Sequence, residues 1–76
     1  MYPIIVNPEI LGGTPVFRGT RVPVKFMFDY LLFGDSVESF VEDYPTVSKE
    51  LANQVLNLAA ELVEQKAPLY DENLVG

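Results

Sequence analysis

The segment from Gly12 to Val24 constrains the fold more than any other stretch, because it is rich in residues that interrupt helices. It holds three of the five glycines and two of the six prolines in the 76 residues. Adjacent glycines permit a turn with positive φ, and proline removes a backbone donor and disfavours helical geometry in the residue before it. We therefore predict two or three very short strands, forming a ribbon with its turn over residues 1–22.

The first of three expected helices begins at Pro23 or Val24 and ends near Phe33. Proline suits a first helical turn, and Gly34 suits the left-handed cap that follows a helix. The helix has only two charged residues and carries two apolar stripes at helical spacing, although a surface helix needs only one. The second stripe must be covered by a partner or, alternatively, by the N-terminal ribbon. This candidate dimer or partner interface consists of Phe26, Tyr30 and Phe33.

Two further helices with a short turn between them complete residues 23–66. The second follows a capping residue at Asp35 or Ser36 and stops before Pro45, and the third follows Ser48 and reaches about Gln65. This order predicts a mainly α-helical domain with a helix-turn-helix, whose third helix occupies the recognition position. The apolar positions of the third helix are Leu51, Val55, Leu58, Ala59 and Leu62.

Composition excludes much chemistry. The chain has no Cys and no His, so we expect no ordinary zinc site, no thiol nucleophile and no imidazole base. The helical carboxylates follow solvent-face spacing, and we interpret them as a solvated surface: Glu38, Glu42, Asp43, Glu61 and Glu64. We therefore expect no enzyme, no metal, no cofactor and no small-molecule substrate.

A single domain over residues 1–66 would have a thin stability margin, and without disulfides or a metal we expect a homodimer. No apolar run approaches the roughly 20 residues that span a bilayer, and the N-terminus lacks a signal-peptide pattern. We therefore expect a cytoplasmic protein with no membrane partner. Residues 67–76 form a C-terminal tail whose candidate partner contacts are Leu69, Tyr70 and Leu74.

Charge is unevenly divided along the chain. Residues 1–28 carry three basic side chains and one acidic, whereas residues 29–76 carry two basic and ten acidic. Such a division could present one end to phosphate and the other to a basic protein, although charge that merely keeps the protein soluble is the alternative.

The candidates for DNA contact lie in two places. The basic cluster around Gly19 and Thr20 could hold phosphate, or it could pair with acids as part of the architecture. Amides on the third helix could read adenine, but that helix has more acidic than basic residues and cannot supply phosphate affinity alone. The DNA-binding candidates are Arg18, Arg21, Lys25, Lys49, Asn53, Gln54 and Asn57.

The run Pro8 to Val24, Pro-Glu-Ile-Leu-Gly-Gly-Thr-Pro-Val-Phe-Arg-Gly-Thr-Arg-Val-Pro-Val, identifies a resemblance. With Tyr30-Leu31, Gly34 and Glu42-Asp43-Tyr44-Pro45, it resembles a family of small prokaryotic proteins known as domain of unknown function four-three-three. The resemblance extends from about Ile4 to Ala60. It implies a homeodomain-like three-helix bundle with an N-terminal β element, and a role as an antitoxin beside a metal-dependent ribonuclease toxin of the PIN type.

Because of this resemblance, we expect a type II antitoxin that binds and neutralises a PIN-like toxin. With that toxin, it would also bind operator DNA at its own promoter. Acidic and apolar surface would cover the basic RNA-binding face of the toxin. Two alternatives remain open: a stand-alone helix-turn-helix transcriptional regulator, and a structural dimerising module in which Arg18 and Arg21 are architectural.

Overall fold

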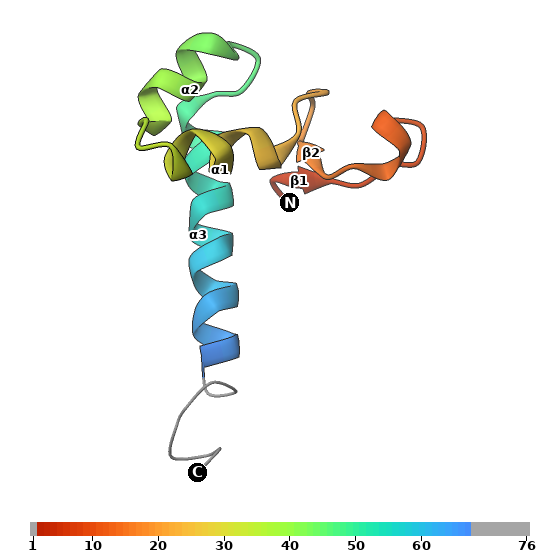
Figure 1. Ribbon diagram of the computed structural model, residues 1–76. Helices are drawn as coiled ribbons and strands as arrows, with labels where there is room; N and C mark the ends of the chain where they lie inside the picture. The colour runs from red at the N-terminus through yellow and green to blue at the C-terminus, as the bar shows by residue number, and fades with distance from the viewer. Residues whose placement is uncertain (1, 68–76) are drawn as a thin grey trace.

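The chain folds as a short β ribbon followed by three helices, and the computed structural model describes residues 2–67 (Figure 1). In chain order the elements are β1 (Ile4–Ile5), a 3-10 turn (Leu11–Gly13), β2 (Val16–Phe17), α1 (Val24–Leu32), α2 (Val37–Asp43) and α3 (Lys49–Lys66). The predicted mainly α-helical fold with an N-terminal ribbon is confirmed. A short turn joins α2 to α3, in the helix-turn-helix order expected of a homeodomain-like bundle.

The ribbon is antiparallel, with Ile4 opposite Phe17 and Ile5 opposite Val16. A bridge between Val16 and Pro23 adds a third extended segment, which confirms the prediction of two or three very short strands. These strands are too short to be stable alone, so the ribbon depends on the helices against which β2 packs.

The Gly-Thr pair within the basic cluster builds the turn that follows β2. Gly19 adopts a φ of 75°, which a residue with a Cβ rarely adopts. The Thr20 hydroxyl donates to the Phe17 carbonyl (2.8 Å) and accepts from the backbone N–H of Val22 (3.0 Å). The backbone N–H of Phe17 donates to the Val22 carbonyl (3.0 Å) and closes the loop. The Gly-Thr sequence therefore has a structural role.

The helix ends follow the predicted caps. At the end of α1, Gly34 has a φ of 91°, and the N–H of Asp35 donates to the Tyr30 carbonyl (2.9 Å). The hydroxyl of Ser36, and not the side chain of Asp35, caps α2 by accepting from the backbone N–H of Ser39 (3.1 Å). The hydroxyl of Ser48 caps α3 in the same way.

The core lies where β2 and the three helices meet. Phe17 of β2 and Phe40 of α2 are fully buried, with ring centroids 5.6 Å apart. This contact joins the ribbon to the helices. The buried hydrophobic cluster comprises Phe17, Val24, Met27, Phe40, Val47, Ala52 and Val55.

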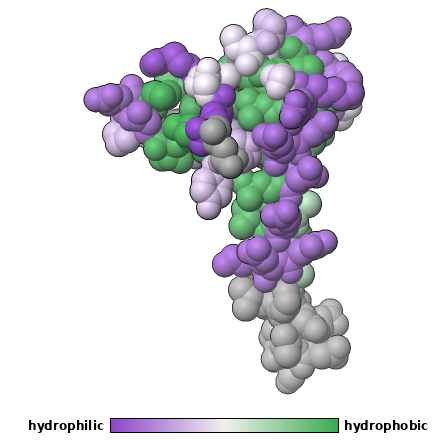
Figure 2. All heavy atoms as spheres, turned by 180° about the vertical axis from the view of Figure 1, so that it is seen from behind, coloured by the Kyte–Doolittle hydropathy of each residue, from purple (hydrophilic) through white to green (hydrophobic). Residues whose placement is uncertain are grey.

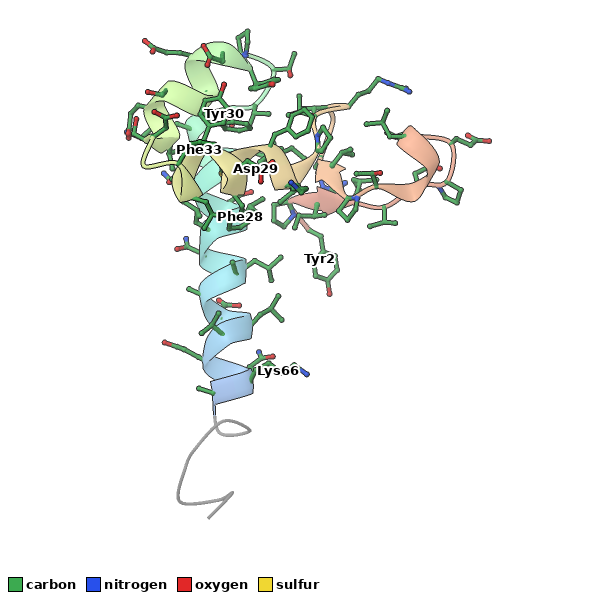
Figure 3. All side chains as sticks on the ribbon, in the orientation of Figure 1. Tyr2, Phe28, Asp29, Tyr30, Phe33 and Lys66 are labelled. Carbon is green, nitrogen blue, oxygen red and sulfur yellow. The ribbon has the colours of Figure 1, made fainter. Side chains whose placement is uncertain are left out.

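The core engages only the first half of α3. Every residue from 60 to 66, which we call the distal half of α3, is exposed, and the helix projects from the body with Lys66 at its end (Figures 1 and 3). Hydrophobic atoms lie along one side of the projecting helix and hydrophilic atoms along another (Figure 2). Of the predicted apolar positions on this helix, Val55 is therefore buried, while Leu62 is 49% exposed. Within residues 2–67, no helix is long and apolar enough to cross a membrane.

Candidate functional site

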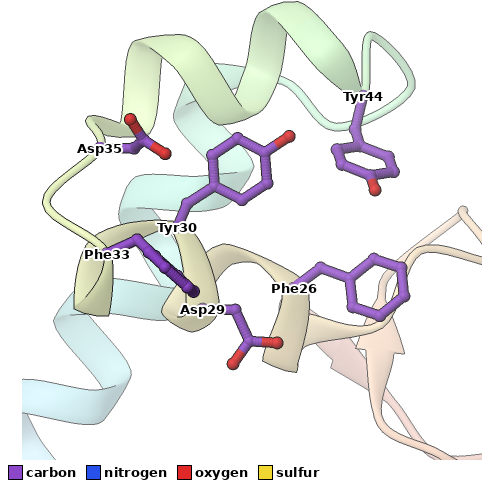
Figure 4. A pocket seen from close by; sticks show the side chains of 6 residues that line it. All are labelled: Phe26, Asp29, Tyr30, Phe33, Asp35 and Tyr44. Atoms are coloured by element: carbon purple, nitrogen blue, oxygen red, sulfur yellow. The ribbon is translucent and has the colours of Figure 1, made fainter.

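A groove between α1 and α2 is lined by aromatic rings and carboxylates, and we call it the aromatic groove (Figure 4). Its volume is about 320 Å³, at the lower end of the range for small-ligand sites. The lining residues are Phe26, Asp29, Tyr30, Phe33, Asp35 and Tyr44.

Helical spacing brings the aromatic residues of α1 together. Phe26 and Tyr30 are four residues apart, and Phe33 follows three residues later, so all three lie on one side of the helix. Tyr44, the last residue before Pro45, ends α2 and faces them from the other side of the groove. Asp35 comes from the loop that follows Gly34.

Tyr30 is the fixed centre of the aromatic groove. Its ring meets the buried Phe40 edge to face at a centroid distance of 5.3 Å. Its hydroxyl donates a 2.5 Å hydrogen bond to Oδ2 of Asp43 on α2. That hydrogen bond is the largest cause that raises the pKa of Tyr30 to about 12, followed by desolvation and the negative charge of Asp43. Tyr30 therefore stays neutral at physiological pH and connects α1 to α2.

The other rings are more accessible than Tyr30. Phe26 packs against Tyr44, with ring centroids 5.8 Å apart and planes at 52°, and remains 39% exposed. Phe33 is 89% exposed, and its neighbour Leu32 is 85% exposed. Large apolar side chains clustered on the surface of a small domain are typical of an interaction site.

The segment that forms the groove is acidic, and two of its carboxylates, Asp29 and Asp35, line the groove. Residues 25–44 contain one basic side chain and five acidic ones. The Asp29 carboxylate pairs with Lys25 (Nζ–Oδ2 2.8 Å), but the Lys25 side chain is largely exposed and that of Asp29 is half-exposed, so this pair contributes little to stability. Asp35 is also exposed. The groove can therefore attract a cation as well as apolar groups.

Glu38 lies on the exposed surface of α2 and forms an ion pair with Lys49 at the start of α3 (3.1 Å). Hydrogen bonding to a backbone N–H is the largest cause that lowers the pKa of Glu38, and Lys49 lowers it further. Glu38 is therefore ionised at neutral pH and adds to the negative charge on α2.

The predicted interface residues Phe26, Tyr30 and Phe33 come together in this groove. The ribbon does not cover them, because it lies beyond the N-terminal end of α1 (Figure 1). Sequence reasoning did not predict that Tyr44 and Asp35 also line the groove, although the helix end at Tyr44-Pro45 could be read from the sequence. The remaining predicted contacts, Leu69, Tyr70 and Leu74, lie outside the described residues.

The basic DNA-binding candidates take separate positions. The Nε of Arg18 donates to the backbone carbonyl of Tyr2, and its backbone N–H donates to the Pro3 carbonyl (2.9 Å), so Arg18 fastens the N-terminal strand. Lys25 and Lys49 engage Asp29 and Glu38, as described above. Arg21 is exposed beside a second hollow that Thr46 also lines.

The polar face predicted for the third helix is exposed as expected, and its candidate base-reading residues are Asn53, Gln54 and Asn57. Their contact with DNA stays a prediction.

Comparison with known proteins identifies relatives without a described activity. The family described as "Protein of unknown function (DUF433)" matches residues 4–59. An uncharacterized protein of Sinorhizobium fredii, y4eO, is 50% identical over 44 residues, which are 58% of this chain and 20% of that protein. The match thus spans about a fifth of the length of that relative. No solved structure matches the chain.

Proposed function

We propose that the chain, which belongs to the DUF433 family, is a type II antitoxin that binds and neutralises a PIN-like ribonuclease toxin. The aromatic groove is the single observation that carries this proposal. It combines exposed rings with carboxylates on one face of the domain.

The chemistry of the groove suits the surface that a ribonuclease uses to bind RNA. Such a surface is basic, because it must neutralise the phosphates of its substrate. Carboxylates such as Asp29 and Asp35 complement the basic groups. A bound partner would bury the exposed side chains of Phe26 and Phe33, and buried aromatic anchors dominate the energy of protein interfaces. The proposed mechanism is occlusion, in which the domain covers the RNA-binding face of the toxin, and its activity is binding and not catalysis.

A homodimer formed through the distal half of α3 is part of this proposal. Leu62 and Val63 are 49% and 69% exposed. Tertiary packing of an amphipathic face supplies most of the stability of helices in proteins, and this segment has no such packing within the described residues. Pairing with the same segment of a second copy would cover these side chains and stabilise the helix. Dimers also suit operator DNA, whose half-sites mirror a two-fold protein.

Co-purification with the product of the adjacent gene tests the antitoxin proposal. The two chains, expressed together with a tag on the toxin, are expected to elute as one complex that does not cleave RNA. Free toxin that retains its ribonuclease activity in the presence of excess antitoxin would refute the proposal.

Operator binding, which Arg21 and the exposed amides of α3 favour, needs its own test. A gel-shift assay on the upstream region of the gene, at two salt concentrations, should show a complex that weakens with salt. A shift by this chain in the absence of any toxin partner would favour a stand-alone regulator. The absence of any salt-sensitive shift, with or without toxin, would exclude both DNA-binding roles.

A further inference from the structure

The aromatic groove places aromatic rings and carboxylates next to one another. Tyr30 lies at the centre, with Asp29 and Asp35 on different sides of it and Phe33 beside them (Figure 4). A cation over the face of an aromatic ring is attracted by the ring quadrupole when it lies within about 6 Å of the centroid. Tyr30 strengthens this attraction, because its hydroxyl donates to the Asp43 carboxylate and draws electron density into the ring.

The carboxylates of Asp29 and Asp35 favour a guanidinium group over an ammonium group. A guanidinium group can stack on a ring with its plane while its edge forms two parallel hydrogen bonds to a carboxylate. An ammonium group is a compact, strongly hydrated charge that cannot do both in the same way. The volume of about 320 Å³ is suited to one side chain with its flanking backbone.

The chain already places one of its own cations at the edge of this site. Lys25 reaches Asp29 with Nζ at 3.0 Å from Oδ1 and 2.8 Å from Oδ2. The Lys25 side chain is 77% exposed, so this pair is held at the surface and a better-fitting cation can displace it.

We propose that the aromatic groove is a receptor for an arginine side chain of a basic protein partner, which stacks on Tyr30 between Phe26 and Phe33 and pairs with Asp29 and Asp35. The chemistry of the site does not depend on the proposed function. The identification of the arginine's source as a protein rests on it.

An NMR titration of the full chain tests the arginine specificity directly. The probe is the capped tripeptide acetyl-Gly-Arg-Gly-amide, and its partners are the same peptide with lysine or with citrulline, which has the shape of arginine without its charge. The arginine peptide should shift the signals of Phe26, Tyr30, Phe33 and Asp35 in a saturable way, with a dissociation constant of about millimolar. The citrulline peptide should cause no such shift, and the lysine peptide should bind several times more weakly. Equal binding of all three peptides, or shifts spread over the distal half of α3, would overturn the proposal.

Charge-matched variants separate the site from general electrostatics. Asp35→Asn should weaken arginine binding by about threefold or more, whereas Glu61→Gln on α3, which changes the net charge equally, should leave it unchanged. Lys25→Gln should strengthen binding by about twofold because it removes the competitor for Asp29, whereas Lys49→Gln should not. These side chains are exposed, so folding is preserved. Equal effects within each pair would contradict a specific site.

The two proposals fail in different ways. If the arginine peptide binds but the adjacent gene product does not, the receptor stands and the antitoxin proposal falls. If the complex with that product forms and Asp35→Asn and Phe26→Leu leave its affinity unchanged, the antitoxin proposal stands and the arginine receptor falls.

Discussion

The hydroxyl of Tyr30 on α1 donates a 2.5 Å hydrogen bond to the carboxylate of Asp43 at the end of α2. This bond joins the two helices that form the aromatic groove and fixes its central ring. The geometry of the groove therefore depends on a residue that is both part of the packing and part of the proposed binding surface.

Tyr30→Phe should loosen the connection between α1 and α2 without creating a cavity. The ring still packs on Phe40, so we expect a modest fall in melting temperature, with the fold retained. The fall in melting temperature is measured by thermal unfolding, with circular dichroism as the signal. Asp43→Asn serves as the control, because it keeps an acceptor for the Tyr30 hydroxyl but removes the charge, and it should have a smaller effect.

The raised pKa of Tyr30 predicts a pH dependence at high pH. The folded state holds the phenol proton up to a pKa of about 12, above the ordinary tyrosine value of 10.0, so the unfolded chain loses it first. The contribution of this group to stability is therefore complete below pH 10 and is lost as the pH rises towards 12. Tyrosinate absorbance should show a step near pH 12 that Tyr30→Phe removes. An unchanged titration curve in that variant would contradict the assignment.

Substitution of a buried and of an exposed phenylalanine should change the stability by very different amounts. Phe17 is fully buried between the ribbon and α2, so Phe17→Ala should cost about 3–5 kcal/mol, which is comparable to the whole stability of so small a domain. Phe33→Ala should change stability by less than about 0.5 kcal/mol, because its ring is largely in solvent. The free energies of unfolding of the two variants are compared by urea denaturation. Similar losses would show that Phe33 also belongs to the core.

The turn after β2 predicts a role for Thr20 in folding and not in binding. Thr20→Val removes the hydrogen bonds to the Phe17 carbonyl and from the Val22 N–H, and should cost about 1–3 kcal/mol. Thr20→Ser retains both bonds and should unfold close to the parent in urea. If neither variant loses stability but both lose binding to a partner protein or to DNA, the turn after β2 is a contact surface.

Local signals made much of the fold predictable. Gly34 and Ser48 mark the end of α1 and the start of α3 through interactions within a few residues, so their effects can be read from sequence. The stripe of Phe26, Tyr30 and Phe33 was likewise visible, because it depends only on helical periodicity.

The remaining features depend on contacts between distant segments. Tyr44 faces Phe26 only because α2 packs along α1, and Arg18 reaches the Tyr2 carbonyl across the ribbon. Periodicity also extends to Leu62, but it carries no information about where the core ends along α3. Packing decides such features, and sequence pattern alone does not.

The distal half of α3 predicts a concentration-dependent oligomer. Leu62→Asn should lower the average mass of the protein in light scattering and reduce the helical signal, because the uncovered segment then frays. Glu61→Gln, beside it on the same helix, should leave the mass unchanged. A parent protein that remains a monomer at high concentration would rule out pairing through α3.

The affinity of the complex with the adjacent gene product, measured by calorimetry for the parent and for Phe33→Ser, tests the central claim most directly. Phe33 is exposed on the aromatic groove, so the substitution should preserve the melting temperature. If the groove is the binding surface, removal of this ring should weaken the complex by about tenfold or more. Equal affinity for the two proteins would contradict the claim that the aromatic groove binds the partner.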